Sequence, residues 1–179
     1  MTTTATTTTA SATAIKALAG HDREIRLFAV WCARGLRAHT RSMRCRLGIV
    51  VAEAFAHDEC TADDVSAIKM AAYAAYDEAA HAAIHTANAA HAAHAAHAVA
   101  TIIGYADDPY AAAVVAAGDA ARIGGETARS AQFTELGRVR ACIDSGVDPY
   151  PRTLGARLRA RLVLWAVRAQ GAASRLLGR

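Results

Sequence analysis

The sequence has few residues that break helices and no framework of covalent links. Of its 179 residues only three are proline, and its four cysteines show neither a CxxC spacing nor the density of a disulfide-rich domain. Few prolines and abundant alanine predict an all-α class, and the length suits one domain with a substantial core. We expect the cysteines to be reduced thiols, largely buried, in a cytoplasmic protein.

Common catalytic motifs are also absent. The sequence contains no GxSxG elbow, no Walker loop and no Gly-rich dinucleotide fingerprint. Adjacent carboxylates such as Asp77-Glu78 are typical of solvated faces or helix caps, and no cation near Cys60 in the sequence would activate its thiol. We therefore expect no enzymatic activity and no cofactor.

Lysine is nearly absent, because 18 of the 20 basic residues are arginine. That bias, with so much alanine, is typical of GC-rich bacterial or phage genomes. The threonine-rich N-terminus lacks the charged and apolar stretches of a secretory signal. Residues 79–106 contain no Asp, Glu, Lys or Arg, but five histidines, an asparagine and weakly apolar alanines make them a poor membrane span. We expect no transmembrane segment.

The alanine-rich middle, residues 61–107, is the most informative stretch. Alanine is the best helix former, and Thr61 followed by Asp63 and Asp64 predicts a capped helix start. Asn and Thr at residues 86–88 predict a break. We expect two helices, at about 61–85 and 89–106, with one long helix as the alternative. Their few large apolar residues require close packing, with a buried stripe formed by Ile68, Ala72, Ala75 and Ala79 and widened by Val65, Tyr73 and Tyr76.

The flanking sequence predicts further helices around this middle. We expect them at 22–38, 42–57, 109–122, 126–143 and 154–177, which gives six or seven helices in all. The bundle domain is expected to span residues 15–147, with the last of these helices after it. Asp108-Pro109 is a start signal, Gly124-Gly125 a kink, and Ser145-Gly146 an end. Ser42 is a possible cap, and Met43, Leu47, Val50, Val51, Ala54 and Phe55 are expected to face inward. Residues 1–14 are expected to be disordered, 148–153 to be a linker, and 154–179 to be a basic amphipathic helix.

The charge is unevenly distributed along the chain. Residues 21–46 carry a net +5, residues 47–151 a net −9, and residues 152–179 seven arginines without any acid. Mutual neutralisation within one compact fold explains this pattern, and binding of an external polyanion is the alternative.

The C-terminal helix is the strongest candidate for a functional surface. One arc contains Leu154, Leu158, Leu162, Trp165, Ala169 and Leu176, and a neighbouring arc contains Arg157, Arg161, Arg168, Arg175 and Arg179. Such a helix suits a membrane surface, a nucleic acid or a protein partner. In the simpler alternative, its leucines and Trp165 close the bundle. Candidate partner-binding residues are Arg157, Arg161, Trp165, Arg168 and Arg175.

A run of histidines in the middle of the chain gives a weaker metal-binding hypothesis. His81 and His85 share a helical face, and the repeat of His91, His94 and His97 rotates by about 60° per step. Adjacent pairs can share a metal, whereas all three cannot easily do so. The weak metal candidates are His81, His85, His91 and His94. Glu78-Ala-Ala-His81 matches half of a di-metal motif, and a second copy is absent. Partly exposed or internally satisfied histidines are the alternative.

Several short stretches carry a family resemblance. They are Trp31-Cys32-Ala33 and residues 49–55, 61–65, 97–101 and 118–121. Through them, residues 25–143 resemble the alanine-rich immunity protein family and related small helical proteins of phages and GC-rich bacteria. The resemblance implies a cytoplasmic, non-enzymatic protein that binds and neutralises a toxin. The basic tail after residue 151 departs from that pattern.

These features favour a non-enzymatic, helical protein-binding module. We expect its partner to be a protein, such as a toxin or a host protein, recognised through opposite charge. One alternative is a nucleic-acid-binding protein that uses the arginines of the first and last helices. Another is a metal-dependent enzyme centred on Glu78, His81 and His85. The sequence leaves the oligomeric state open.

Overall fold

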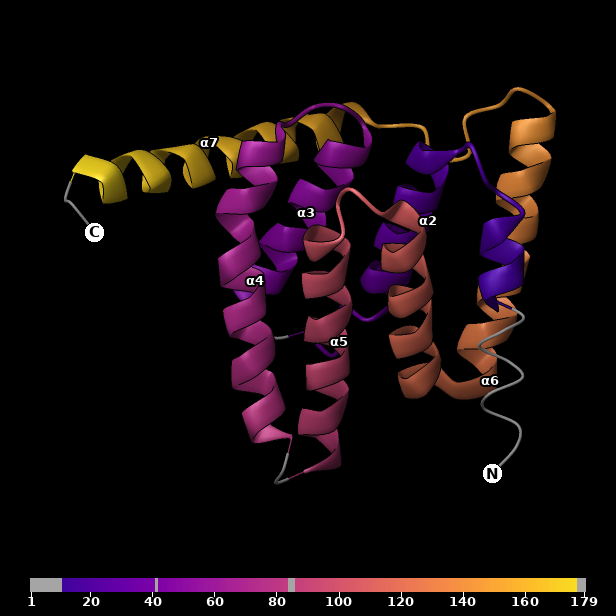
Figure 1. The fold of residues 1–179 in the computed structure, drawn as a ribbon, viewed down its shortest axis with the longest axis horizontal. Helices are drawn as coiled ribbons and strands as arrows, with labels where there is room; N and C mark the ends of the chain where they lie inside the picture. Colours follow the sequence, from indigo (N-terminus) through magenta and orange to yellow (C-terminus); the bar gives the residue numbers. More distant parts are fainter. Residues whose placement is uncertain (1–10, 41, 84–85, 177–179) are drawn as a thin grey trace.

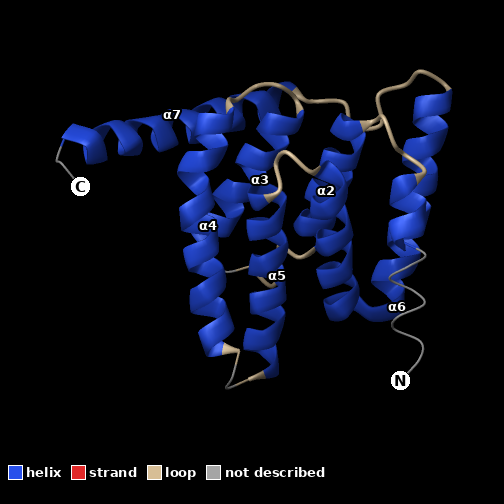
Figure 2. Cartoon of the chain, in the orientation of Figure 1, coloured by secondary structure: helices blue, strands red, loops and turns tan. Residues whose placement is uncertain are grey.

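The computed structural model describes residues 11–40, 42–83 and 86–176, and every regular element within these ranges is a helix (Figures 1 and 2). The predicted all-α class is confirmed. A short helix at residues 11–16 precedes α2 (Asp22–Gly35), α3 (Met43–Ala56), α4 (Ala62–Ala82), α5 (Ala87–Gly104), α6 (Pro109–Asp144) and α7 (Leu154–Leu176). No helix in these ranges combines the length and apolarity that a membrane span needs.

The N-terminal segment is more ordered than the sequence suggested. Residues 11–16 are helical, so the prediction of disorder through residue 14 is wrong for residues 11–14. Residues 1–10 lie outside the described ranges. Ile15 and Leu18 explain the difference, because both side chains are fully buried in the core and anchor the segment that carries them.

Local capping fixes where most helices begin. Thr61 and Asp64 form a capping box at the start of α4, while the Thr86 hydroxyl accepts from the amide of Ala89 at the start of α5. Asp108 caps α6 with Pro109 in its first turn, as predicted. The break at Thr86 means that the middle is two helices rather than one. Ser42 precedes α3 as predicted, but its side chain makes no capping hydrogen bond.

The helices pack as neighbouring pairs around a shared core. α4 lies against α5, α2 and α5 both pack on α6, and α3 contacts α2, α4, α5 and α7. α6 reverses direction at Gly125, whose positive φ of 58° suits glycine. Its two halves lie side by side (Figure 1), and Gln132 donates from Nε2 to the carbonyl of Ala117 across them at 2.9 Å. The predicted kink is therefore confirmed.

Small side chains bring the helix backbones close together. Ala95, Ala98 and Ala100 of α5 and Ala113 and Ala116 of α6 are all fully buried. Gly48 of α3 sits so close to α5 that an added Cβ would lie 2.8 Å from Val99 Cγ1 and 2.7 Å from Ile103 Cδ1. The core is thus closed mainly by short side chains at close range.

The inward face predicted for α3 is only partly right. Val51 and Ala54 are fully buried, but Met43 is 63% exposed. Cys45 and Ile49, which were not predicted, are buried instead. Because four other helices pack around α3, it is buried on several sides and has no single apolar stripe from which to deduce its orientation. On α4 the predicted stripe is correct for Ile68, Ala72 and Ala75.

The predicted linker, residues 148–153, lies against the bundle. The Asp148 carboxylate accepts from Arg23 Nη2 at 2.9 Å and from Nη1 at 3.2 Å, and Pro149 is buried. α7 follows directly and lies across one end of the bundle (Figure 1). The start of α7 is therefore fixed to the rest of the chain rather than tethered loosely.

We predict that Gly48→Ala destabilises the fold, whereas Gly118→Ala does not. Both positions are helical, so both substitutions gain about 1 kcal/mol in helix propensity. A Cβ meets nothing within 4 Å at Gly118 but collides with Val99 and Ile103 at Gly48. Overpacking of this kind costs about 1–3 kcal/mol. Urea denaturation of both variants measures the difference, and equal stabilisation by the two would contradict the close packing.

Candidate functional site

Thr153 caps the start of α7. Thr153 Oγ1 accepts from the amide of Ala156 at 3.2 Å, and the Thr153 carbonyl accepts from the amide of Arg157 at 3.1 Å. The helix then runs for 23 residues and contains no acidic side chain. Figure 1 shows its C-terminal end extending past α4, beyond the bundle.

The face of α7 that contacts the bundle consists of moderately sized side chains. Ala160, Leu164 and Val167 are buried and face α3 and α4. In the simpler of the two interpretations of the sequence, the larger leucines and Trp165 would pack against the bundle. That alternative is wrong, since the contact runs along a different side of the helix.

The larger apolar residues point to solvent. The exposed fractions are 73% for Leu154, 52% for Leu158, 70% for Leu162 and 71% for Trp165. We call these four residues the outer face of α7. Ala169 is also exposed, and the side chain of Leu176 lies outside the described side chains. A contiguous row of large apolar side chains in solvent is a feature of interaction surfaces.

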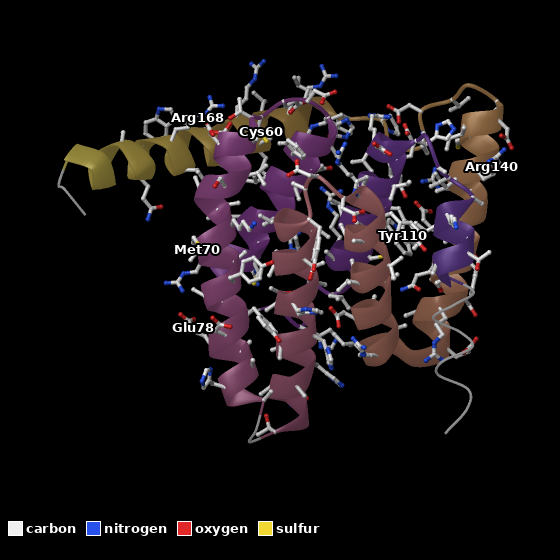
Figure 3. All side chains as sticks on the ribbon, in the orientation of Figure 1. Cys60, Met70, Glu78, Tyr110, Arg140 and Arg168 are labelled. Carbon is white, nitrogen blue, oxygen red and sulfur yellow. The ribbon has the colours of Figure 1, made fainter. Side chains whose placement is uncertain are left out.

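Arg168 fixes the orientation of α7 on the bundle. Its Nε and Nη2 atoms donate to Asp64 Oδ1 and Oδ2, both at 2.7 Å, in a two-pronged ion pair. Figure 3 labels Arg168 on α7, close to the start of α4. The same carboxylate accepts from the amide and hydroxyl of Thr61 at 3.0 Å. The hydrogen bonds from Arg168, followed by those from Thr61, hold the pKa of Asp64 well below its usual range.

The other predicted partner-binding residues lie beside the outer face. Arg157 Nε is 3.7 Å from Glu59 Oε1, which is a weak and exposed pairing. Arg161 is exposed, and no carboxylate in the described ranges lies within ion-pair distance of it. The backbone of Arg175 is helical, but its side chain lies outside the described side chains. The structure therefore places Arg157, Arg161 and Arg168 on one helix with Trp165.

The proposed metal centre on α4 is not assembled in the described residues. Glu78 Oε1 accepts from Arg44 Nη1 at 2.7 Å, and His81 Nδ1 lies 2.7 Å from the carbonyl of Asp77 in the preceding turn. His85 lies outside the described ranges. Glu78 and Met70 lie along the outward side of α4, away from the core (Figure 3). These partners leave Glu78 and His81 without a common ligand position.

The second group of histidines is brought together by a buried carboxylate. His94 Nδ1 lies 3.1 Å from Asp119 Oδ1, and His97 Nδ1 lies 2.6 Å from Asp119 Oδ2. Arg122 Nη1 donates to the same carboxylate at 2.9 Å. Asp119 is completely buried, so these donors compensate a charge held between α5 and α6. His91 instead packs edge-on against His39.

This cluster leaves two imidazole nitrogens available. Because the carboxylate accepts, each ring in its neutral form donates through Nδ1–H and keeps a lone pair at Nε2. His94 and His97 line a hollow of about 540 Å³ together with Tyr76 and Arg122. Within the described ranges, no group of three or more His, Cys, Asp or Glu side chains is placed to hold a metal. The arrangement is best explained as a set of polar contacts that hold α5 against α6.

His97 and Asp119 were not among the predicted site residues. The sequence signal was present, since His94 and His97 are three residues apart and Asp119 is the one acid in residues 109–125. What the sequence could not supply was the packing of α5 on α6, which brings residues 22 positions apart into contact.

Three of the four cysteines, Cys32, Cys45 and Cys60, offer no activated thiol. Cys32 and Cys45 are buried, and burial raises the pKa of both. Burial, followed by the nearby charge of Asp64, raises the pKa of Cys60 to about 11. A thiol of that kind is a poor nucleophile at neutral pH.

We predict that Asp64→Asn lowers the free energy of unfolding by about 1–3 kcal/mol at neutral pH, since it weakens charge-assisted hydrogen bonds. Asp63→Asn, exposed in the same turn, serves as the control and should cost less than about 1 kcal/mol. The pKa of Asp64 is depressed in the folded state, so its stabilisation is complete above the ordinary value of 3.8 and declines as the pH falls. Urea titrations should therefore show that the difference in free energy of unfolding between wild type and Asp64→Asn becomes smaller below about pH 4. A difference that stays constant in acid would contradict the stabilising role of the Asp64 carboxylate.

We predict that His94 and His97 carry their proton on Nδ1 when neutral. Both rings point this nitrogen at Asp119, which needs a donor. Nitrogen-15 NMR of the imidazoles distinguishes the two tautomers directly. In Asp119→Ala both rings should shift toward the Nε2–H form. Tautomers that remain unchanged in that variant would contradict the hydrogen bonds from both Nδ1–H groups to Asp119.

The chain was compared with protein families, curated proteins and solved structures. No family model, curated protein or solved structure matches it. Its resemblance to the immunity proteins therefore remains a prediction.

Proposed function

We propose that this chain is a non-enzymatic protein-binding module whose partner docks on the outer face of α7. The observation that carries the proposal is the exposure of Leu154, Leu158, Leu162 and Trp165 in one row. Burying a large apolar side chain stabilises a complex by about 1.5–3 kcal/mol before the costs of association. A partner that covers this row gains most of its affinity there.

The arginines beside the row define the chemistry of the partner. Arg157, Arg161 and Arg168 lie along one edge of the outer face. Asp64 pairs with Arg168 and Glu59 lies near Arg157, whereas no carboxylate in the described ranges lies within ion-pair distance of Arg161. Trp165 sits one helical turn from both Arg161 and Arg168, and Trp and Arg are the side chains most enriched at interface hot spots. We infer a protein partner with an apolar centre and an acidic rim. Such complementarity raises the association rate and makes it sensitive to salt.

A toxin-neutralising immunity protein, or a protein that binds a host factor for a phage, would act in this way. Both work by covering a surface of the partner and need no reactive group. The helical bundle supplies a rigid base that presents α7, and the resemblance of residues 25–143 to immunity proteins is consistent with this role. The toxin or host factor would be recognised mainly by α7, the part that departs from the family pattern.

The test compares two substitutions that are matched in exposure. Leu162→Asp alters the outer face, whereas Met70→Asp introduces the same charge at a position that is 75% exposed on α4. Each immobilised variant is incubated with an extract of the source cell. Proteins that bind to wild type and to Met70→Asp, but not to Leu162→Asp, are identified and purified. Their affinity for each variant is then measured by calorimetry. We expect Leu162→Asp to weaken the purified complex about 100-fold and Met70→Asp less than about threefold. The partner should have an acidic contact surface.

Other occupants of the outer face would give different results. A wild-type dimer that Leu162→Asp converts to a monomer would assign the face to a second copy of the chain. Retention of wild type, but not Leu162→Asp, on phosphatidylglycerol vesicles would assign it to a membrane surface. A purified partner that binds Leu162→Asp as tightly as wild type would also contradict the proposal.

A further inference from the structure

A second cationic feature lies at the start of α7 and shares no residue with its outer face. A hollow of about 490 Å³ is lined by arginines from both ends of the chain, namely Arg34 and Arg37 near the end of α2 and Arg152 and Arg159 near the start of α7. Ion pairs within the bundle place two of these side chains, since Arg34 pairs with Glu53 and Arg152 with Glu59. Neither those pairs nor the proposed docking of a partner protein explains why Arg37 and Arg159 converge with them.

The charges around the hollow are not balanced. Glu53 is the one acid in its lining, and its Oε2 atom pairs with Arg34 Nη2 at 2.5 Å. Arg37 and Arg159 are exposed, and in the described ranges no carboxylate lies within ion-pair distance of either. Glu53 offsets Arg34, and Glu59, which lies outside the lining, pairs with Arg152. Arg37 and Arg159 have no such partner in the described ranges, so these two leave an excess of positive charge at the hollow.

Arg152 is the most unusual of the four arginines. Its side chain is 3% exposed, with Nη2 3.0 Å from Glu59 Oε2 and Nη1 3.9 Å from Glu53 Oε2. These carboxylates offset its charge, yet none of its three nitrogens has a hydrogen-bond partner of good geometry. Leaving buried donors unsatisfied is costly.

The first turn of α7 contributes a further donor. Thr153, Gly155 and Ala156 line the hollow, and the first amides of a helix have no acceptor within the helix. Thr153 Oγ1 already accepts from the amide of Ala156, so the amide of Gly155 is the one that faces the hollow without a hydrogen bond in the described ranges. No acidic side chain occupies this turn to offset the positive end of the helix dipole. Gly155 adds no side chain that would keep a ligand from the backbone. A helix start next to several guanidinium groups is a favourable environment for an anion.

We propose that this hollow binds a phosphorylated small molecule, with Arg37, Arg159 and the start of α7 holding its phosphate. Arginine forks match the oxygens of a phosphate better than a single ammonium does. The volume lies in the range of small-molecule sites and exceeds what a lone phosphate needs. The four arginines converge on one concave spot rather than following an extended stripe, which favours a compact ligand over a nucleic-acid backbone.

The test uses the full-length, untagged chain and measures binding of inorganic phosphate, pyrophosphate and ATP by calorimetry at fixed salt. We expect saturable binding of at least one probe with one site per chain. Arg37→Gln and Arg159→Gln should each weaken it about tenfold, the loss expected for one charge-assisted hydrogen bond. Both side chains are exposed and lack ion-pair partners in the described ranges, so these variants should keep the wild-type stability.

Arg161→Gln is the matched control, because it removes the same charge from the same helix outside the hollow. It should change the affinity less than about twofold, since a distant exposed charge is screened by salt. Equal weakening by Arg161→Gln and Arg159→Gln would show general charge attraction and overturn the proposal. So would the absence of saturable binding of all three probes, or binding of a short DNA duplex with none of the probes. Because Arg159→Gln leaves the outer face intact, failure here is distinguishable from failure of the proposed protein docking.

Discussion

The close approach of helix backbones is the constraint on which the rest of the structure depends. Alanines fill α5 and the first half of α6, and Gly48 lets α3 come within contact of Val99 and Ile103. A core of this kind is closed by short side chains and has no spare volume for long ones. The large apolar residues of α7 therefore find no place in it, and α7 meets the bundle through Ala160, Leu164 and Val167 instead.

Ion pairs at two places along α7 fix which side of the helix faces solvent. The pair between Asp64 and Arg168 joins α7 to the capping box of α4, so one carboxylate sets both a helix start and the orientation of the last helix. At the beginning of α7, Arg152 is held inside by Glu53 and Glu59. With these contacts made, α7 has an apolar row on its outward side and an arginine-lined hollow at its first turn. The apolar row and the arginine-lined hollow thus share no residue, although α7 contributes to both.

Features set by neighbouring residues could be predicted from the sequence, and features set by packing could not. The capping box at Thr61, the break at Thr86 and the kink at Gly125 depend on a few adjacent residues, and each was correctly predicted. The buried faces of α3 and α7 were misjudged, because each depends on which helices surround it. The contact between His97 and Asp119, and the convergence of Arg37 with Arg159, join residues far apart in the chain. Helical periodicity has no information about such pairs.

The central claim is that the outer face of α7 is in water when the chain is alone. The most direct measurement is quenching of Trp165 fluorescence by acrylamide in a Trp31→Phe variant, in which Trp165 is the one remaining tryptophan. The structure predicts a red-shifted emission and quenching close to that of free indole, because Trp165 is 71% exposed. A blue-shifted emission that acrylamide does not quench, at every protein concentration tested, would mean that these side chains close the bundle and would contradict the account.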